Sequence, residues 1–272
     1  MNSKEIRISV IGAGKIGEAI VNALLATGYK NITATCRTER RKKELTYLPI
    51  EVLLDNRKAA STSDVIILSV KPHQVIPVFK EIEEYVENGK RLVISVAAII
   101  TTRKIEESVK GIRVVRAMPN INLIARHSAT AVCRGTNVSE DDMNLVKELF
   151  GAMGYVVEVD EKYIDAITAY SGSGPAYVLE FFEAFLLAGL KIGLPRDIAY
   201  DLAIHTIIGS AKLLEKGGKH PAEYRDMVIT PGGVTIDAIH ILEKTGFKAD
   251  IIDAVKEAYE KCKNFSQNLN NK

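Results

Sequence analysis

Three glycines near the N-terminus have the spacing of a turn that binds a nucleotide phosphate. Gly12, Gly14 and Gly17 follow an apolar strand pattern that begins at Ile6, and an amphipathic helix pattern comes after them. In such a turn the first glycine makes the bend, the second lets the backbone approach a pyrophosphate, and the third lets the helix pack on the strand. The first helical N–H groups would point at the phosphates. Segment 12–17 therefore predicts a dinucleotide site, against the alternative of an ordinary turn between a strand and a helix.

Two further glycine-rich stretches lie in the second half of the chain. Residues 171–176 read Ser-Gly-Ser-Gly-Pro-Ala, which interrupts one helix pattern and starts another, and residues 230–235 read Thr-Pro-Gly-Gly-Val-Thr before a short helix pattern. The backbone amides of Gly233, Val234 and Thr235 at the start of that helix predict a site for a carboxylate. The hydroxyl of Thr235 would lie within one turn of this site, unless Thr235 only caps the helix.

The elements that must position these residues are strands and helices in alternation. Apolar strand patterns recur, with amphipathic helix patterns between them, at residues 6–11, 32–35, 65–69, 92–96, 113–117, 128–134 and 155–159. This alternation predicts an α/β fold with a Rossmann-type, doubly wound parallel sheet. Such sheets bind ligands at the carboxyl ends of their strands. We therefore expect the strand endings 69–72, 95–98 and 118–120 to converge on one ligand.

From Glu161 onward the apolar residues recur only at helical spacing. We therefore predict two domains, a dinucleotide-binding domain over 1–160 and an all-helical domain for substrate binding and dimerisation over 161–272. Small residues such as Ala184 and Gly189 would allow two helices to approach closely. The helical part carries more apolar surface than one layer of helices buries, which predicts a helix-swapped or tightly paired homodimer.

The residues after the second strand pattern distinguish the two nicotinamide dinucleotides. A carboxylate at this place binds the ribose 2′-hydroxyl of NADH, whereas cations accommodate the 2′-phosphate of NADPH. Segment 35–41 has no acid at the strand end and offers Arg37, Arg40 or Arg41 to a phosphate. The sequence thus favours NADPH and leaves NADH open. The alternative is that Arg40 and Arg41 lie on the solvated face of the next helix.

Composition argues against several classes of partner. The 272 residues include 36 basic and 34 acidic ones, which gives a formal net charge of +2. A net charge this small would not attract nucleic acid or an anionic membrane, so we expect a small-molecule ligand. Glu180 and Glu183 are expected to interrupt the most apolar helix before it reaches the length needed to cross a membrane, and no signal-peptide pattern is evident. Three scattered cysteines fit a reducing cytoplasm better than disulfides or a zinc site.

Three other candidate groups are assigned structural or binding roles. Asp201 and His205 lie one helical turn apart, but two ligands without a third are typical of a helix face, and we predict no metal site. Ser173 lacks the G-x-S-x-G spacing of a hydrolase nucleophile. Lys71 precedes Pro72, which forces an extended backbone, and we expect Lys71 to line the cofactor site rather than to transfer protons.

Taken together, these motifs resemble those of the pyrroline-5-carboxylate reductase family over residues 6–265. The resemblance is carried by the fingerprint 12–17, by Asn56, and by segments 70–72, 97–98, 118–120, 171–177, 193–195 and 231–235. The pair Ser-Gly-Ser-Gly-Pro and Pro-Gly-Gly-x-Thr, in that order and separation, is highly specific. The resemblance implies a Rossmann domain followed by a helical domain, a dimer interlocked through the helices and, in many members, assembly into a decamer.

The activity that the resemblance implies is reduction of L-1-pyrroline-5-carboxylate to L-proline by NAD(P)H, the last step of proline synthesis. Glu161, Val234 and Thr235 match the family's substrate contacts, beside Gly233 of the carboxylate site. The residues predicted to bind the cofactor are Gly12, Ala13, Gly14, Lys15, Ile16, Gly17, Cys36, Arg37, Thr38, Asn56, Ser69, Val70, Lys71, Pro72, Ala97, Ala98 and Asn120. A hydroxyl donor at the imine nitrogen favours hydride transfer, and we assign this catalytic role to Thr235.

Two departures from the family pattern leave the identity of the substrate undecided. Ile121 and Asn122 replace the usual Thr-Pro, and Ile99 replaces the usual glycine, near the expected nicotinamide end of the site. A related cyclic imine is therefore an alternative substrate. Two other classes also remain: a β-hydroxyacid dehydrogenase relative would use a lysine where this chain has residues 173–175, and a nonenzymatic dinucleotide sensor would not need segment 231–235.

Overall fold

The apolar runs of the first half of the chain form one eight-stranded sheet. The structure is a computed structural model that describes residues 3–270. The strands are β1 (Ile8–Ile11), β2 (Ile32–Thr35), β3 (Glu51–Leu53), β4 (Val65–Leu68), β5 (Leu92–Ser95), β6 (Arg113–Met118), β7 (Ser128–Arg134) and β8 (Gly154–Glu158). Their order across the sheet is β3-β2-β1-β4-β5-β6-β7-β8. The order changes direction between β1 and β4, and ligands bind open α/β sheets at such a point.

The predicted parallel sheet is confirmed with two differences. β7 runs antiparallel to β6, with Arg116 opposite Cys133, and β8 then pairs in parallel with β7. Only residues 119–127 join β6 to β7, which is too short a connection for a parallel crossover. The sequence does not predict β3, because this edge strand has only three residues and begins with an exposed glutamate.

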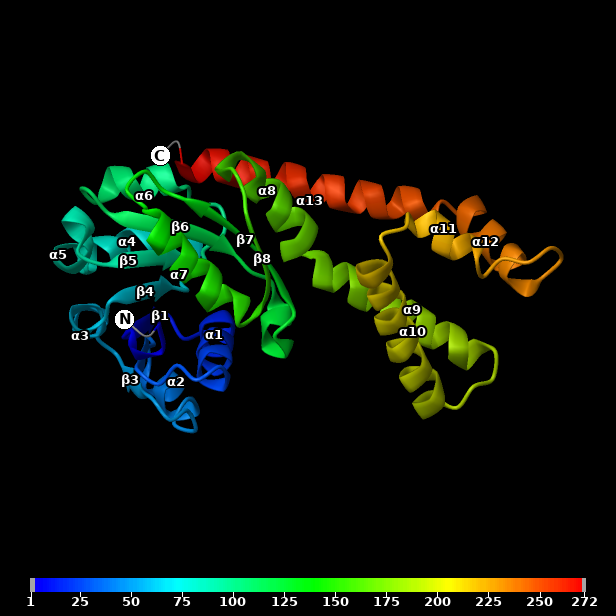
Figure 1. Cartoon of the computed structure of the whole chain (residues 1–272), viewed down its shortest axis with the longest axis horizontal. Coiled ribbons are helices and arrows are strands. Elements are labelled where there is room, and N and C mark those ends of the chain that lie inside the picture. Colours follow the sequence, from blue (N-terminus) through cyan, green and yellow to red (C-terminus); the bar gives the residue numbers. More distant parts are fainter. Residues whose placement is uncertain (1–2, 271–272) are drawn as a thin grey trace. The chain divides into compact units, whose positions relative to one another are not determined.

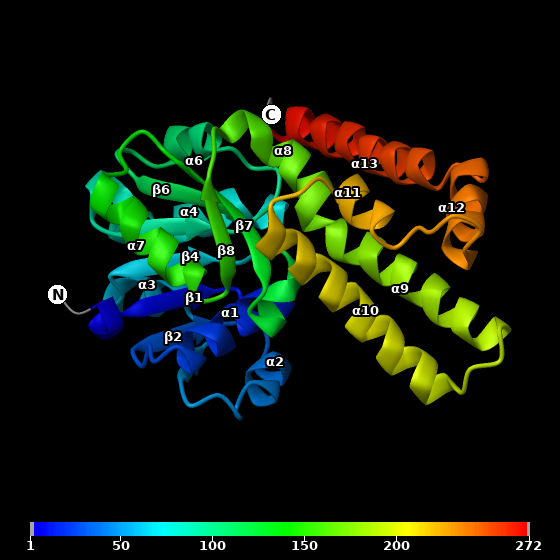
Figure 2. The same ribbon diagram turned by 45° about the vertical axis from the view of Figure 1, so that its right-hand side comes forward.

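Helices cover both faces of this sheet (Figure 1), because successive strand residues point to opposite faces. α1 (Lys15–Ala26) and α7 (Glu140–Gly151) pack on the face that carries Ile8 and Val10. The opposite face carries Ile11 and Ile66, and its helices are α3 (Asn56–Thr62), α4 (Val75–Glu81), α5 (Glu83–Val86) and α6 (Thr102–Ser108). The short helix α2 (Glu39–Glu44) follows β2. Figure 2 shows the same sheet and helices from a second direction.

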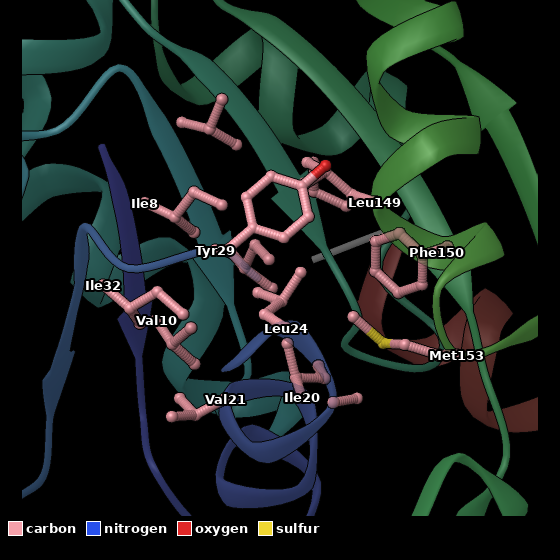
Figure 3. Close-up of a cluster of buried hydrophobic side chains, with 14 of the residues drawn as sticks. Ile8, Val10, Ile20, Val21, Leu24, Tyr29, Ile32, Leu149, Phe150 and Met153 are labelled. Carbon is pink, nitrogen blue, oxygen red and sulfur yellow. The ribbon is translucent and has the colours of Figure 1, made fainter. Parts of the chain in front are cut away.

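The core on the α1 side of the sheet is shown in Figure 3. Ile20 and Leu24 of α1 and Phe150 of α7 are fully buried, in one cluster with Val10 of β1. Each large apolar side chain that is buried in this way contributes about 1.5–3 kcal/mol. The packing holds α1 against β1 and so fixes the glycine turn that joins them. Gly28, with a φ of +94°, lies beyond the end of α1.

Beyond residue 160 the described chain contains helices and turns but no strand, as predicted. Its elements are the 3₁₀ turn η5 (Glu161–Tyr163), α8 (Ile164–Ile167), the π-helical segment η6 (Thr168–Gly172), α9 (Gly174–Lys191), α10 (Arg196–Gly217), α11 (Pro221–Asp226), α12 (Val234–Lys244) and α13 (Phe247–Asn270). The Ser-Gly-Ser-Gly-Pro stretch ends η6 and begins α9, which confirms the predicted change of helix at this motif.

α9 and α10 pack closely against each other at small residues. A Cβ on Gly189 would lie 3.0 Å from the Cβ of Ala199, and the ring of Phe182 meets that of Tyr200 edge-on at 5.2 Å. This is the close approach predicted for Gly189. Large apolar side chains of these helices are nevertheless exposed in the single chain, including Val178, Leu179, Leu187, Ile198 and Leu202. An exposed apolar surface of this kind is typical of a protein interface.

One helical stretch, Glu161–Lys191, is long and apolar enough to cross a membrane by length and composition. The expectation that Glu180 and Glu183 keep the most apolar helix below spanning length is therefore wrong by this measure. The reason is that η5, α8, η6 and α9 follow one another with only Ser173 outside a helical element, so that together they reach this length. By itself such a stretch is weak evidence for a membrane segment.

The chain divides into two compact units. Unit 2 is Gly174–Glu257, and unit 1 comprises the described residues up to Ser173 together with those from Ala258 onward. The predicted domains 1–160 and 161–272 differ from these units, because residues 161–173 and the end of α13 belong with the sheet. Ile164 packs in a cluster with Cys133 of β7, and Asn270 accepts a hydrogen bond from the backbone N–H of Thr101. As a division of function, the boundary at residue 160 stays a prediction.

Candidate active site

The glycine turn after β1 has the geometry of a phosphate-binding turn. Gly12 has a φ of +94°, and a Cβ there would lie 2.7 Å from the carbonyl oxygen of Ser69. A Cβ on Gly17 would lie 2.5 Å from the carbonyl oxygen of Gly12, whereas a Cβ on Gly14 would meet nothing within 4 Å. Gly14 is also the N-cap of α1, and no side chain caps this helix end. The turn is therefore closed on the protein side and open at a helix N-terminus, which suits a phosphate.

Thr35 at the end of β2 is hydrogen-bonded to the backbone of this turn. The backbone amides of Gly12 and Ala13 donate to the carbonyl oxygen of Thr35 at 3.2 and 2.6 Å. The hydroxyl of Thr35 donates to Oδ1 of Asn56 at 2.7 Å, and Nδ2 of Asn56 donates to Glu81 at 2.9 Å. These bonds join the ends of β1 and β2 to α3 and α4.

A cleft of about 770 Å³ opens beside the turn, within unit 1. Ten of the residues predicted to bind the cofactor line this cleft, namely Gly12, Ala13, Gly14, Cys36, Arg37, Thr38, Asn56, Ser69, Val70 and Lys71. They follow the carboxyl ends of β1, β2 and β4 or begin α3, as the rule for open α/β sheets predicts. The volume lies in the range of clefts that bind small molecules and cofactors.

The three arginines near the end of β2 have different surroundings. Arg37 is exposed, lines the cleft and has no ion-pair partner among the described residues. Arg40 is exposed and pairs with Glu44 one helical turn away. Arg41 donates through Nε to the carbonyl oxygen of Ala13 and pairs with Glu18 at 2.5 Å. Arg41 lines the cleft as well, but its guanidinium is already bound to Glu18, Glu44 and the glycine turn. Arg37 is thus the arginine that is free to bind a phosphate.

The thiols of the chain are poor nucleophiles and are not paired. Cys36 lines the cleft, where burial raises the pKa of its thiol, which donates to the carbonyl oxygen of Thr38 at 3.6 Å. Burial also raises the pKa of Cys133 to about 12. Cys36, Cys133 and Cys262 are all free. Within residues 3–270, no group of three or more His, Cys, Asp or Glu side chains is placed to hold a metal ion.

Seven predicted cofactor residues do not line this cleft, namely Lys15, Ile16, Gly17, Pro72, Ala97, Ala98 and Asn120. Gly17 acts from behind the turn, through its close contact with Gly12. Asn120 is buried, and its Nδ2 donates to the carbonyl oxygen of Ser171 at 2.9 Å while its Oδ1 accepts from the backbone N–H of Asn122. Asn120 therefore ties the loop after β6 to the Ser-Gly-Ser-Gly-Pro stretch, and its contact with a cofactor stays a prediction.

Glu161, a predicted substrate contact, is engaged in an internal network. Its carboxylate accepts hydrogen bonds from the backbone N–H of Thr102 at 2.7 Å and from the hydroxyl of Thr102 at 2.6 Å. Nη1 of Arg116 lies 3.1 Å from the same carboxylate, and Arg116 is 1% exposed. Nη2 of Arg116 faces Asp165 at 3.7 Å. Glu161 therefore neutralises a buried arginine of β6, and a role in binding substrate stays a prediction.

The predicted carboxylate site lies in unit 2, at the start of α12. Gly233 is the N-cap of α12 and no side chain caps the helix, so the alternative role of Thr235 as the cap is wrong. A Cβ on Gly233 would lie 2.3 Å from Oγ1 of Thr230, which explains the glycine at this position. Gly232 has a φ of +70°, a conformation that glycine adopts without strain. The N–H of Gly233 donates to the carbonyl oxygen of Thr230 at 3.0 Å, so its predicted contact with a carboxylate is wrong in this conformation. The turn leaves the first N–H groups of α12, from Val234 onward, available to an anion.

Sequence reasoning missed several residues that shape the cleft. Thr35 and Glu81 support the turn and Asn56, and His73, Gln74 and Val78 line the cleft. The position of Thr35 at a strand end is a signal that could have indicated it. Glu81 and Val78 lie on α4, and only the packing of this helix beside α3 brings them to the cleft.

The comparison with known proteins places this chain among relatives of similar length. A family model described as pyrroline-5-carboxylate reductase dimerisation matches residues 161–265, and one described as NADP oxidoreductase, coenzyme F420-dependent, matches residues 7–99. A pyrroline-5-carboxylate reductase of Corynebacterium melassecola is 39% identical over 268 residues, which cover 96% of this chain and 98% of the relative. The chain belongs to the pyrroline-5-carboxylate reductase family.

Other members of the family are similar to this chain in sequence or structure over nearly its whole length. A pyrroline-5-carboxylate reductase of Arabidopsis thaliana is 36% identical and covers 97% of both chains. The crystal structure of a Plasmodium falciparum pyrroline carboxylate reductase with NADP bound has a TM-score of 0.89 at 29% identity and covers 97% of this chain and 99% of its own. The Coxiella burnetii reductase has a TM-score of 0.87 at 34% identity and covers 96% and 98%. The residues that match the dimerisation model include α9 and α10, whose apolar surface is exposed in the single chain.

Proposed function

We propose that this chain reduces L-1-pyrroline-5-carboxylate to L-proline with NADPH. The observation that carries the proposal is similarity over 96–97% of the chain to pyrroline-5-carboxylate reductases from a bacterium and a plant. The cleft beside the glycine turn supports the cofactor. It combines an open phosphate-binding turn at Gly14 with the cation of Arg37, which has no ion-pair partner in the described part of the chain. The first residues after β2 (Cys36, Arg37 and Thr38) include no carboxylate that could bind a ribose hydroxyl.

The residues of the cleft fit each part of a dinucleotide phosphate. The first amides of α1 and the open face of Gly14 suit the pyrophosphate. The guanidinium of Arg37 would bind the 2′-phosphate with charge-assisted hydrogen bonds. Lys71 stands before Pro72 with a φ of −66° and a ψ of 150°, so its backbone is extended along the cleft. When bound, NADPH supplies the hydride that converts the imine carbon to a C–H group.

The start of α12 is proposed to hold the substrate. The backbone amides of Val234 and Thr235 would donate to the substrate carboxylate, and the hydroxyl of Thr235 would donate to the imine nitrogen, while the amide of Gly233 donates to Thr230 within the turn. Reduction converts C=N to CH–NH, which consumes one hydride and one proton. Because a hydrogen bond at nitrogen draws electrons from the imine carbon, it makes that carbon a better hydride acceptor. Acid assistance of this kind contributes about 10²- to 10⁴-fold to rate.

We also propose that the working protein is a cytoplasmic homodimer paired through unit 2, with further assembly into a decamer, and that it binds neither nucleic acid nor membrane. The exposed apolar side chains of α9 and α10 support pairing, and a dimer interface would also account for the apolar composition of 161–191. Size-exclusion chromatography with light scattering tests the assembly. A monomer, or a protein recovered only with detergent, would contradict this proposal.

The activity is tested by following NADPH oxidation with defined substrates. Purified protein should oxidise NADPH with pyrroline-5-carboxylate faster than with a six-membered cyclic imine carboxylate. A 3-hydroxyacid assayed in the reverse direction with NADP should show no turnover. Tight NADPH binding without turnover of any cyclic imine would instead identify a dinucleotide sensor. Faster turnover of the six-membered imine would make that ring the substrate, and the replacements at Ile99, Ile121 and Asn122 would then be examined as its cause.

A further inference from the structure

The loop that follows β5 contains an isoleucine in a backbone conformation that isoleucine rarely adopts. Ile99 has a φ of +80°. The other non-glycine residues with positive φ in the described chain are Asn88 and Arg126, so Ile99 alone among them is β-branched. The branched Cβ of isoleucine crowds the backbone in this region, and such strain persists only where surrounding contacts impose it.

A three-residue turn is closed around Ile99 by the backbone N–H of Ile100, which donates to the carbonyl oxygen of Ala98 at 3.0 Å. The side-chain contacts that hold this turn come from the end of α13. Nδ2 of Asn270 donates to the carbonyl oxygen of Ile99 at 2.9 Å. Oδ1 of Asn270 accepts from both the backbone N–H and the hydroxyl of Thr101, each at 3.1 Å. The hydroxyl of Ser266 also donates to the carbonyl oxygen of Ile99, at 3.4 Å. One side chain, Asn270, thus fixes the backbone on both sides of residue 100.

Asn270 is itself held in place for this task. Its Nδ2 also donates to the carbonyl oxygen of Ser266 at 2.7 Å, one helical turn earlier on α13. Ile100 between the two clamped residues is 3% exposed and packs in the core on the α6 side of the sheet. On the other side of the loop, Thr102 is bound by Glu161. Segment 99–102 is therefore fixed by α13, by the core and by Glu161.

This clamped loop lies beside the cofactor cleft. β5 pairs with β4 in parallel, with Ser95 opposite Leu68, and the backbone N–H of Val96 donates to the carbonyl oxygen of Leu68 at 3.0 Å. The residues directly after Leu68 are Ser69 and Val70, which line the cleft. Ala97 and Ala98, predicted cofactor contacts, stand between this hydrogen bond and Ile99. Their position along the sheet edge therefore depends on the conformation of Ile99.

We propose that Asn270 is a positioning residue for the cofactor: by holding Ile99 in its strained conformation it sets the place of Ala97 and Ala98 at the edge of the NADPH site. Without the clamp, the backbone of Ile99 would relax toward negative φ and carry the two alanines with it. A glycine at residue 99 would adopt a φ of +80° without strain and would depend less on Asn270. The proposal rests on NADPH being the cofactor.

The experiment measures NADPH binding directly, so that it does not depend on the substrate. The dissociation constant is read from the fluorescence of NADPH, which tryptophan does not obscure because the chain has none. Asn270→Ala should weaken NADPH binding about tenfold, the value expected for losing one or two good hydrogen bonds. Asn268→Ala, on the same turn of α13 but exposed, is the matched control and should bind as the wild type does.

The decisive variant combines Asn270→Ala with Ile99→Gly. We expect the loss caused by Asn270→Ala to fall to about twofold or less in the Ile99→Gly background, because the glycine keeps the loop conformation without the clamp. An equal loss in both backgrounds, or unchanged NADPH binding in Asn270→Ala, would overturn the proposal. Should Asn270→Ala fail to fold, Asn270→Asp replaces it, because aspartate still accepts from Thr101 but donates nothing to Ile99. Wild-type protein that binds no NADPH would refute the proposed function instead.

Discussion

Nε of Arg41 donates to the carbonyl oxygen of Ala13 at 2.9 Å, so a cation from α2 holds the glycine turn from the side. Glu18 and Glu44 take up the other two nitrogens of the same guanidinium, at 2.5 and 3.1 Å. Arg37, four residues earlier, has no such partner among the described residues and lines the cleft. The two arginines therefore support cofactor binding in different ways, and substitution separates them.

We predict that Arg37→Met raises the KM for NADPH about 10- to 100-fold and leaves the KM for NADH unchanged, because only the 2′-phosphate is lost as a partner. Arg41→Met should raise both KM values by similar factors, because it loosens the turn that both dinucleotides use. Arg40→Met is the control, since its exposed pair with Glu44 contributes little. Steady-state kinetics with each cofactor decides. A loss specific to NADPH in Arg41→Met would make Arg41 a phosphate ligand.

Alanine substitutions at the three glycines of the turn are predicted to have different effects on stability and on NADPH binding. Gly12→Ala and Gly17→Ala should each lower the free energy of unfolding by about 2 kcal/mol or more, because their Cβ atoms would meet backbone at 2.7 and 2.5 Å. Gly14→Ala should lower it by no more than about 1 kcal/mol, since its Cβ has no neighbouring atom of the described chain within 4 Å and alanine is only a poorer N-cap than glycine. Gly14→Ala should still weaken NADPH binding. Urea unfolding measures the free energy of unfolding, and NADPH titration measures the affinity. Normal NADPH binding by Gly14→Ala would contradict the proposed site for the pyrophosphate.

The stability contributed by Glu18 should depend on pH. A hydrogen bond from the Tyr47 hydroxyl and, after it, the pair with Arg41 hold the pKa of Glu18 below its ordinary value of 4.5. A carboxylate with a lowered pKa stabilises the folded state above its unfolded pKa, and this contribution is lost as pH falls through the folded pKa. The Tm difference between wild type and Glu18→Gln should therefore be largest above pH 4.5 and shrink below it. A difference that grows toward acid pH would contradict this assignment.

Thr235 is predicted to act on the chemical step. Thr235→Ala should lower kcat about 10²- to 10⁴-fold and leave NADPH affinity nearly unchanged, whereas Thr235→Ser, which keeps the hydroxyl, should retain most of the activity. Stability should change little in either variant, because Gly233 and not Thr235 is the N-cap of α12. Stopped-flow turnover at saturating substrate provides kcat. An unchanged kcat in Thr235→Ala would remove Thr235 from the mechanism.

Glu161 is predicted to contribute mainly to the stability of the folded chain rather than to substrate binding. Glu161→Ala leaves Arg116 in the core with only Asp165 at 3.7 Å, and it should cost about 2–3 kcal/mol. Glu107→Ala is the matched control: its exposed pair with Arg103 on α6 should contribute less than about 1 kcal/mol. Urea midpoints compare the two. Normal stability of Glu161→Ala together with a raised KM for the imine would instead support the substrate contact that the family resemblance implies.

Local patterns in the sequence were sufficient for the dinucleotide turn and for most of the sheet. A turn closed by Gly12, a helix beginning after Gly14 and strands of four to seven residues depend on neighbours in the chain, so spacing alone predicts them. The same is true of the change of helix at residues 171–176. The family membership followed from motifs of this local kind, and the comparisons confirmed it.

Contacts between residues far apart in the chain were decided only by the tertiary structure. Ile99 and Asn270 are 171 residues apart, and the sequence around neither residue predicts the hydrogen bond between them. The direction of β7, the separate tasks of Arg37 and Arg41, and the pairing of Glu161 with Arg116 are of the same kind. Spacing along the chain determines backbone conformation and which side chains share a face. Which distant donor meets which acceptor depends on the path of the whole chain, because a hydrogen bond forms only when the folded chain brings the two atoms into contact with suitable alignment.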